Sequence, residues 1–140
     1  MNEQHTVIDL FSGCGGFSYG FQESGYNVVA GVDHTQIALD TFELNHNGAK
    51  GLNIDLFKDD AVDKIISELP NGTADIIIGG PPCQGFSLTG TRNKEDKRNR
   101  LFYSAFDLAK EISPKAIIIE NVPGIVNLYD GMAKSEIYRM

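Results

Sequence analysis

Residues Ala74-Asp75-Ile76-Ile77-Ile78-Gly79-Gly80-Pro81-Pro82 form an apolar run that ends in a glycine and proline turn. A strand that is exposed on one face alternates apolar and polar residues, and this run does not. Val7-Ile8 and Ile117-Ile118-Ile119 show the same unbroken pattern. Strands of this kind are buried on both faces, which is typical of a parallel sheet covered by helices on each side.

Strand and helix patterns alternate along the rest of the chain. Apolar stretches predict five strands, at Thr6–Phe11, Asn27–Val32, Leu52–Leu56, Ala74–Ile78 and Lys115–Ile119. Apolar residues three and four positions apart predict four amphipathic helices, at Phe17–Ser24, Gln36–Asn45, Asp59–Leu69 and Leu101–Ile112. This alternation predicts a doubly wound α/β fold with a mainly parallel sheet and the strand order 3-2-1-4-5.

Length and composition indicate one globular domain. The chain has 140 residues, 41% of them hydrophobic and 22% charged, which is close to the average for globular proteins. No apolar run approaches the roughly 18 residues of a membrane span, and residues 1–5 lack the features of a secretory signal. Two cysteines, Cys14 and Cys83, do not indicate a disulfide scaffold, so we expect a protein of the reducing cytoplasm.

The net charge of -7 argues against a nucleic-acid partner, because phosphate-binding proteins usually have a basic surface. One segment departs from this balance, with about +3 of local charge between positions 92 and 100. Its basic residues are Arg92, Lys94, Lys97, Arg98 and Arg100. Such a run is either a solvated loop or a phosphate-binding segment, and its place just after Cys83 favours the second interpretation.

A glycine-rich turn follows the first predicted strand, in the stretch Asp9-Leu10-Phe11-Ser12-Gly13-Cys14-Gly15-Gly16-Phe17. Glycines in such a turn let a ligand approach the backbone closely. The dinucleotide fingerprint G-x-G-x-x-G is absent, because Ser18 stands where its last glycine belongs. A nicotinamide cofactor is therefore disfavoured.

Acidic residues end the second and third predicted strands. Asp33 lies about 20 residues beyond Gly13, where doubly wound enzymes place an acid that accepts hydrogen bonds from ribose hydroxyls. This pattern predicts nucleoside binding. Asp33 and Asp55 are also placed to be N-caps of the helices that follow them, so the sequence leaves both roles open.

The connection from Gly79 to Arg100 is far longer than the roughly 2 to 6 residues usual between a strand and a helix, which indicates a functional loop. Two prolines restrict its backbone just before Cys83. Cys83 is either a small buried hydrophobe or an exposed thiolate, and its rigid turn beyond a strand end favours a nucleophile. The predicted strand order places this turn opposite the glycine-rich turn, with Glu120 at the end of the fifth strand beside them.

Taken together, these residues resemble the cytosine-5 DNA methyltransferase family. The similar stretches are Asp9–Gly16, Asp33 with the helix to Asn45, Asp55, Gly80–Ser87, Leu101-Phe102 and Glu120-Asn121-Val122. Pro81-Pro82-Cys83-Gln84 and Glu120-Asn121-Val122 are the most specific of them. The resemblance covers nearly the whole chain, and it implies a Rossmann-like fold that binds S-adenosyl-L-methionine and double-stranded DNA.

The resemblance also implies a covalent mechanism for methylation of cytosine. In the family a cysteine thiolate adds to C6 of the base, so that C5 can accept a methyl group, and Cys83 is the residue in that position. Glu120 is the candidate proton donor at N3, and loss of the C5 proton releases Cys83. Asn121 and Pro82 are expected to position the base and the loop. The target base must leave the duplex, because neither carbon is accessible inside it.

Further residues are assigned to cofactor and DNA by the resemblance alone. Cofactor contacts are implied for Phe11, Ser12, Gly13, Cys14, Gly15, Gly16, Asp33, His34, Asp55, Leu56, Pro81 and Leu101. Asp33 is assigned to ribose and Asp55 to adenine, while Phe11 and Leu101 are equally acceptable as core residues. DNA contacts are implied for Gln84, Ser87, Arg92, Lys94, Lys97, Arg98 and Arg100.

Two features depart from the family pattern. His34 stands where the family usually has a bulky apolar residue that packs on adenine. The family also continues with an arginine-bearing catalytic motif, a target-recognition region and a last segment that completes the cofactor site, and none of these is found here. We therefore expect residues 1–140 to be the N-terminal portion of a catalytic domain, either shortened or split from a C-terminal partner chain. The family further implies a prokaryotic protein associated with the nucleoid through DNA.

Other functions stay open at this point. The chain could be a catalytically silent fragment that binds the cofactor and needs a partner, although retention of Cys83 and Glu120 argues against a degenerate relative. It could methylate transfer RNA, although Gln84-Gly85-Phe86-Ser87 looks more like the DNA branch of the family. A metal enzyme is disfavoured, because the three histidines show no ligand spacing with either cysteine.

Overall fold

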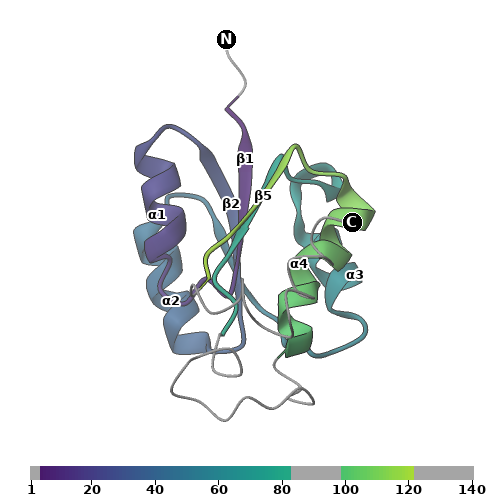
Figure 1. Ribbon diagram of the computed structural model, residues 1–140. Coiled ribbons are helices and arrows are strands. Elements are labelled where there is room, and N and C mark those ends of the chain that lie inside the picture. The colour runs from purple at the N-terminus through teal and green to yellow at the C-terminus, as the bar shows by residue number, and fades with distance from the viewer. Residues whose placement is uncertain (1–3, 83–98, 122–140) are drawn as a thin grey trace.

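The computed structural model describes residues 4–82 and 99–121 and shows one parallel sheet with helices on both faces (Figure 1). Its five strands are β1 (Thr6–Leu10), β2 (Asn27–Asp33), β3 (Lys50–Asn53), β4 (Ile76–Gly79) and β5 (Ala116–Ile119). Its helices are α1 (Gly16–Glu23), α2 (Gln36–Asn45), α3 (Ala61–Glu68) and α4 (Asn99–Ile112), with a short 3-10 helix at Pro70–Gly72. The strand order is β3-β2-β1-β4-β5, so the predicted fold class and topology are confirmed.

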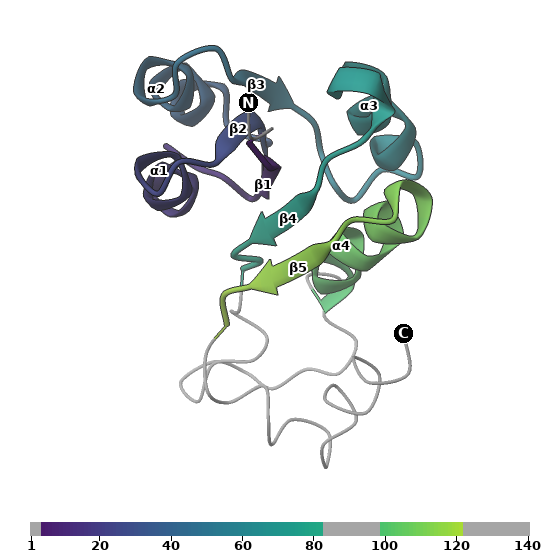
Figure 2. The ribbon, with the colours of Figure 1, turned by 90° about the horizontal axis from the view of Figure 1, so that it is seen from above.

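The helices divide between the two faces of the sheet. Viewed from above, α1 and α2 lie on one side and α3 and α4 on the other (Figure 2). Because both faces are covered, the central strands need no polar side, and Val7, Ile8, Ile77 and Ile78 are all fully buried. The apolar runs of β1 and β4 therefore form the centre of the core. The expectation of burial on both faces is wrong for β5, the last strand in the order, where Ile118 is 41% exposed.

All five strands differ from their predicted ranges by one or more residues, and the differences at the third and first strands bear on the site. The third strand was expected at Leu52–Leu56, but its ladder with β2 runs from Lys50 to Asn53. The apolar residues after Asn53 follow the end of the strand. The first strand stops at Leu10, because Phe11 has a φ of 60° and turns the chain out of the sheet.

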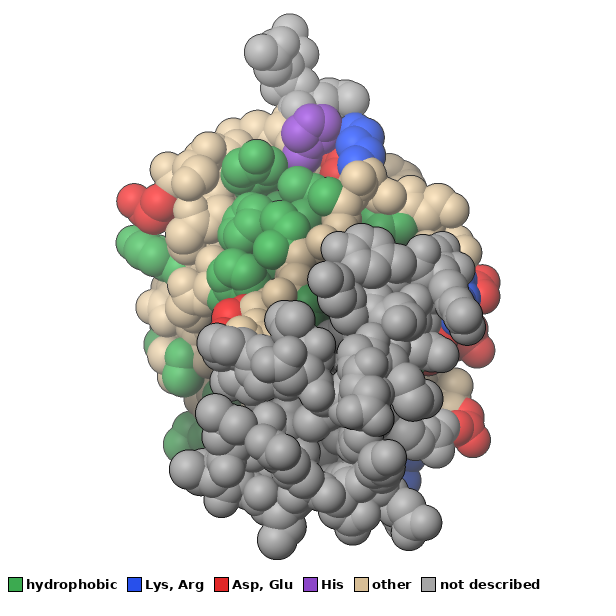
Figure 3. All heavy atoms as spheres, in the orientation of Figure 1, with side chains coloured by type: hydrophobic (Ala, Val, Ile, Leu, Met, Phe, Trp, Pro, Cys, Tyr) green, Lys and Arg blue, Asp and Glu red, His purple; other side chains and the backbone are tan. Residues whose placement is uncertain are grey.

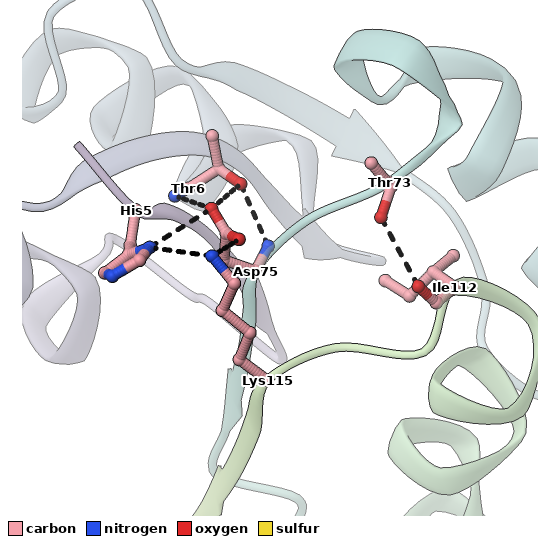
Figure 4. A network of polar contacts seen from close by, with 6 residues as sticks. All are labelled: His5, Thr6, Thr73, Asp75, Ile112 and Lys115. Atoms are coloured by element: carbon pink, nitrogen blue, oxygen red, sulfur yellow. Dashed lines mark hydrogen bonds and ion pairs between the residues drawn. The ribbon is translucent and has the colours of Figure 1, made fainter. Parts of the chain in front are cut away.

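A polar cluster joins the N-terminal ends of β1, β4 and β5 (Figure 4). Asp75 Oδ2 accepts hydrogen bonds from the Thr6 backbone N–H at 2.8 Å and from Thr6 Oγ1 at 3.1 Å, and Asp75 Oδ1 accepts one from Lys115 Nζ at 2.7 Å. His5 Nδ1 lies 3.6 Å from the same carboxylate. The hydrogen bond from Lys115 and those from Thr6 hold the pKa of Asp75 far below its usual value.

We expect Asp75→Asn to lower the free energy of unfolding by about 1 to 2 kcal/mol at pH 7. The asparagine side chain carries no charge to pair with Lys115, and it has one acceptor oxygen where the carboxylate has two. Asp107→Asn is the matched control, since Asp107 forms an exposed pair with Lys110 at 3.4 Å and should change stability by a few tenths of a kcal/mol at most. Urea unfolding measures both variants. The loss of stability caused by Asp75→Asn should shrink as the pH falls. A carboxylate with a lowered pKa contributes its full stability above the ordinary aspartate pKa and loses it progressively below that value. Equal effects of the two substitutions at pH 7 would contradict this assignment.

The surface seen in Figure 3 carries apolar side chains next to charged ones. Ile37 and Leu44 of α2 are 77% and 87% exposed. Within residues 4–82 and 99–121, no helix is long and apolar enough to cross a membrane.

Candidate active site

The glycine-rich turn between β1 and α1 is held in an unusual backbone conformation. Phe11, Gly13 and Gly15 all have positive φ, at 60°, 52° and 88°. The Ser12 N–H donates to Val32 O of β2 at 3.0 Å, and the Gly15 N–H donates to Ser12 O at 2.8 Å. The turn is therefore fixed against the end of β2, and its backbone is kept close to the C-terminal edge of the sheet.

Asp33 links this turn to the end of β2. Its Oδ2 accepts a hydrogen bond from the Gly13 N–H at 3.0 Å, and its Oδ1 accepts one from the Thr35 N–H at 2.9 Å. The N-cap position of α2 is occupied by Thr35, so Asp33 is not the N-cap itself. Each carboxylate oxygen has a further lone pair, and the carboxylate can accept hydrogen bonds from a ligand as well.

The strand ends enclose a pocket of about 420 Å³. Its lining combines two carboxylates with a mainly apolar wall, which is typical of a site for a small organic ligand with a few polar groups. The lining residues are Phe11, Asp33, His34, Ile54, Asp55, Leu56, Phe57, Gly80, Pro82 and Leu101. Since all of them lie at or beyond strand ends or at the start of α4, the pocket occupies the position that doubly wound sheets use for ligands.

The segment after β3 supplies one wall of the pocket. Asp55 Oδ1 accepts a hydrogen bond from the Phe57 N–H at 3.0 Å, which shapes the turn that follows the strand. Ile54, Phe57 and Gly80 line the pocket but were not predicted as site residues. An apolar residue directly before the acid that follows a strand is the signal that could have identified Ile54.

The opposite wall comes from the end of β4 and the neighbouring end of β5. The Glu120 N–H donates to Gly79 O at 2.9 Å, which extends the pairing of the two strands by one residue. A Cβ built on Gly80 would lie 3.7 Å from Glu120 Oε2, so the Glu120 side chain lies against the backbone of a pocket residue. Pro82 lines the pocket, and Cys83, the next residue in the sequence, lies outside the described residues.

A second acid, Asp9, lies buried at the base of the glycine-rich turn. It is 1% exposed and accepts a hydrogen bond from the Ser18 N–H at 3.3 Å. Burial raises the pKa of Asp9 to about 6, the Ser18 hydrogen bonds oppose this shift, and the nearby charge of Asp33 adds to it. The ionised form of Asp9 therefore opposes folding at neutral pH.

We expect Asp9→Asn to change how stability depends on pH. An acid whose pKa is raised in the folded state contributes stability below its unfolded value of 3.8 and loses it as the pH rises through about 6. The Asp9→Asn variant lacks this loss, so its stability relative to the parent should rise by about 2 to 3 kcal/mol between pH 4 and pH 7. Urea unfolding across this range measures the difference. Parallel profiles for the two proteins would show that Asp9 does not titrate with a raised pKa.

The structure brings together only some of the residues assigned to cofactor and catalysis. Phe11, Asp33, His34, Asp55, Leu56, Leu101 and Pro82 line one pocket. Ser12, Gly13, Cys14, Gly15 and Gly16 form the adjoining turn, and Pro81, Glu120 and Asn121 lie at the ends of β4 and β5 without lining the pocket. Cys83 and the DNA residues Gln84, Ser87, Arg92, Lys94, Lys97 and Arg98 lie outside the described residues, and of Arg100 only the backbone, in α4, is described.

Across residues 4–82 and 99–121, no group of three or more histidine, cysteine, aspartate or glutamate side chains is arranged to hold a metal ion. Cys14, in the glycine-rich turn, is a free and exposed cysteine.

The sequence that builds this turn and pocket matches a known protein family. The family model for C-5 cytosine-specific DNA methylases matches residues 5–140. The chain belongs to this family. The match includes the glycine-rich turn, both pocket acids and the turn after β4, so the residues that build the pocket lie within the family's domain.

Relatives with known names agree with this assignment. The chain is 43% identical over 123 residues to the Type II methyltransferase M.DdeI of Desulfomicrobium norvegicum, and 39% identical over 127 residues to the Type II methyltransferase M.AgeI of Thalassovita gelatinovora. These alignments cover 88% and 89% of the chain but 29% of each relative. The chain thus spans less than a third of the length of these two methyltransferases.

Solved structures with the same fold include methyltransferases. A candidate DNA modification methyltransferase encoded within an Escherichia coli prophage superposes with a TM-score of 0.75 at 32% identity, over 97% of this chain and 37% of that one. The Dnmt2 methyltransferase of S. pombe superposes with a TM-score of 0.71 at 20% identity, over 98% of this chain and 40% of that one. The second likeness shows a shared fold only.

Proposed function

We propose that this C-5 cytosine-specific DNA methylase chain is the N-terminal, cofactor-binding and nucleophile-bearing portion of a DNA cytosine-5 methyltransferase. The observation that carries the proposal is the pocket that joins Asp33 and Asp55 to Pro82, the residue before Cys83. This arrangement supports a nucleoside site and a cysteine nucleophile at the same edge of the sheet. Relatives named Type II methyltransferases support a role in restriction and modification.

The residues present fit S-adenosyl-L-methionine. Asp33 can accept hydrogen bonds from ribose hydroxyls, and Asp55 can accept one from the adenine amino group. Phe11 and Leu101 offer apolar surface for the flat base, and the backbone of the glycine-rich turn is assigned to the methionine side. When bound, this cofactor supplies an activated methyl group. His34 Nδ1 lies 3.4 Å from Asp33 Oδ1, and the His34 side chain is 82% exposed, so its ring can pack on the base as the usual apolar residue does.

Cys83 and Glu120 act on the cytosine. The thiolate of Cys83 forms a bond to C6 of the base, and Glu120 holds a proton at N3, where the displaced electron pair would otherwise leave a negative charge. After C5 has gained its methyl group, its proton is lost to solvent, the C5–C6 double bond reforms, the bond to the Cys83 sulfur breaks and the thiolate leaves. N3 returns its proton to Glu120, and Asn121 and Pro82 position the base and the turn.

Double-stranded DNA is the proposed substrate. A cytosine inside a duplex shields C5 and C6, so the base must be flipped out before Cys83 can attack it. The basic residues between positions 92 and 100 and the polar residues Gln84 and Ser87 are proposed to hold the distorted strand. The basic residues between positions 92 and 100 give this segment a positive charge, although the chain as a whole has a net charge of -7.

Trapping of the covalent step tests this function. The chain is mixed with S-adenosyl-L-methionine and duplex DNA that contains 5-fluorocytosine, which has no C5 proton to lose, and its intact mass is recorded. We expect a mass increase equal to one DNA strand plus the transferred methyl group. An RNA with 5-fluorocytidine is the substrate control, and an adduct with RNA alone would overturn the assignment to DNA.

A second mixture tests whether the chain needs the portion that its longer relatives add. The same experiment is therefore repeated with the C-terminal two thirds of M.DdeI added as a separate chain. An adduct only in that mixture identifies an incomplete enzyme. No adduct in either mixture, together with no binding of S-adenosyl-L-methionine by calorimetry, would overturn the proposed function.

A further inference from the structure

The C-terminal end of α2 contacts the glycine-rich turn from outside the pocket. Asn45 Nδ2 donates a hydrogen bond to Cys14 O at 3.1 Å, and Gln22 Nε2 of α1 donates one to Asn45 O at 3.3 Å. Asn45 therefore connects the turn with both helices that pack on this face of the sheet. Neither Asn45 nor His46 lines the pocket, so these contacts do not belong to the ligand surface described above.

His46, the residue after α2, is fully buried beside the same turn. Its ring stacks on Phe42 with 4.1 Å between centroids and 17° between planes, and its Nδ1 lies 2.8 Å from Phe42 O. A carbonyl oxygen only accepts, so Nδ1 carries the hydrogen. The other ring nitrogen, Nε2, has no hydrogen-bond partner among the residues that the structure describes.

The His46 ring packs directly against the backbone of Gly15. A Cβ built on Gly15 would lie 2.2 Å from His46 Cε1 and 2.7 Å from Phe42 Cδ2, which is closer than non-bonded atoms approach. Because Gly15 has no side chain, both stacked rings can pack directly against the backbone of the turn. A buried nitrogen without a partner opposes folding, so stability alone does not account for a histidine at this position.

We propose that Asn45 and His46 are positioning residues for the cofactor turn, which they hold in its positive-φ conformation so that the Gly13 N–H stays on Asp33. The proposal rests on the proposed function for its ligand. Asp33 fixes the turn on the pocket side through Gly13, while Asn45 and His46 fix it on the opposite side through Cys14 and Gly15. Positive φ is costly for Phe11 but not for Gly13 and Gly15, and glycines are free to adopt other conformations. The turn therefore needs contacts on both sides to stay in one conformation.

Asn45→Asp is the first test, because it puts a carboxylate oxygen where Nδ2 donates to Cys14 O. Asn47→Asp is the matched control, since it makes the same chemical change at an exposed residue two positions further on. We expect the amide hydrogens of Gly13 and Gly15 to exchange about 10-fold faster in the Asn45→Asp variant, and the Kd for S-adenosyl-L-methionine to rise about 10-fold. The Asn47→Asp variant should match the parent in both measurements. Unchanged exchange in the Asn45→Asp variant would overturn the proposal.

His46→Ala is the second test, with Ile112→Ala as its control. Ile112 is a buried residue at the C-terminal end of α4, and its backbone O accepts a hydrogen bond from Thr73 Oγ1 at 3.4 Å. Both substitutions therefore lower the Tm, but only one removes the support of Gly15. We expect faster exchange at Gly13 and Gly15 and a weaker Kd in the His46→Ala variant alone. Equal increases in the exchange rates and in the Kd for both variants would show that His46 acts only as a core residue. If neither the parent chain nor its mixture with the C-terminal portion of M.DdeI binds S-adenosyl-L-methionine or forms the adduct, the proposed function fails, and the exchange rates still decide whether Asn45 and His46 hold the turn.

Discussion

The Cys83→Ala variant is expected to form no covalent adduct with DNA that contains 5-fluorocytosine. The thiolate is the group that bonds to C6 in the proposed mechanism, and an alanine side chain has no nucleophile. We expect complete loss of the adduct, measured as the absence of the combined mass of protein and DNA strand in the intact-mass spectrum. Proteolysis of the parent adduct should place the modified peptide at Cys83.

Two controls make this result specific. Cys83→Ser keeps the size of the side chain and should also lose the adduct, because a hydroxyl is a far weaker nucleophile than a thiolate at neutral pH. Thermal unfolding should show that both variants keep the Tm of the parent within a few degrees. An adduct that persists in the Cys83→Ala variant would show that another residue attacks the base.

Gly15→Ala is expected to destabilise the chain by about 4 kcal/mol, which lowers the Tm by more than about 10 °C for a domain of this length. Two costs combine. A φ of 88° is unfavourable for an alanine, at roughly 1 to 3 kcal/mol, and the new Cβ would overlap the His46 and Phe42 rings, which adds about 1 to 3 kcal/mol. We also expect the cofactor affinity to fall, because the turn must move to relieve the overlap.

Gly16→Ala is the matched control for this prediction. Gly16 is the first residue of α1, and a Cβ built there meets no atom within 4 Å. Alanine favours a helix over glycine by up to about 1 kcal/mol, so this variant should be as stable as the parent or slightly more stable. Differential scanning calorimetry measures both proteins. Similar Tm values for the Gly15→Ala and Gly16→Ala variants would contradict the packing described at Gly15.

The sheet could be predicted from the sequence because its strands are short apolar runs separated by amphipathic helices. Ile76, Ile77 and Ile78 are buried in succession, and side chains that point to both faces of a strand can all be buried only where helices cover both faces. The topology then follows from the handedness of parallel connections. Asp33 could be identified for the same reason, since the end of the second strand is fixed once the sheet is known.

The pocket walls were harder to predict, because they depend on where the chain leaves the sheet. Ile54 and Leu56 belong to an apolar pattern that extends the third strand in sequence, yet the pairing with β2 stops at Asn53. Phe11 adopts a positive φ that no bulky residue favours, and only its neighbours in space make this possible. His46 gave no signal at all, because a single histidine after a helix is typical of a solvated residue, whereas this one is fully buried.

The Asp75 cluster and the pocket lie at opposite ends of the same strands, and this separation has a consequence for engineering. The polar contacts among Thr6, Asp75 and Lys115 fasten three strands at the end away from the pocket. Segments at the pocket end can therefore be exchanged for those of relatives without disturbing these contacts. Chimeras in which only the segments after β3 and β4 are replaced should keep the fold of the recipient, and they offer a route to grafting new recognition onto a constant scaffold.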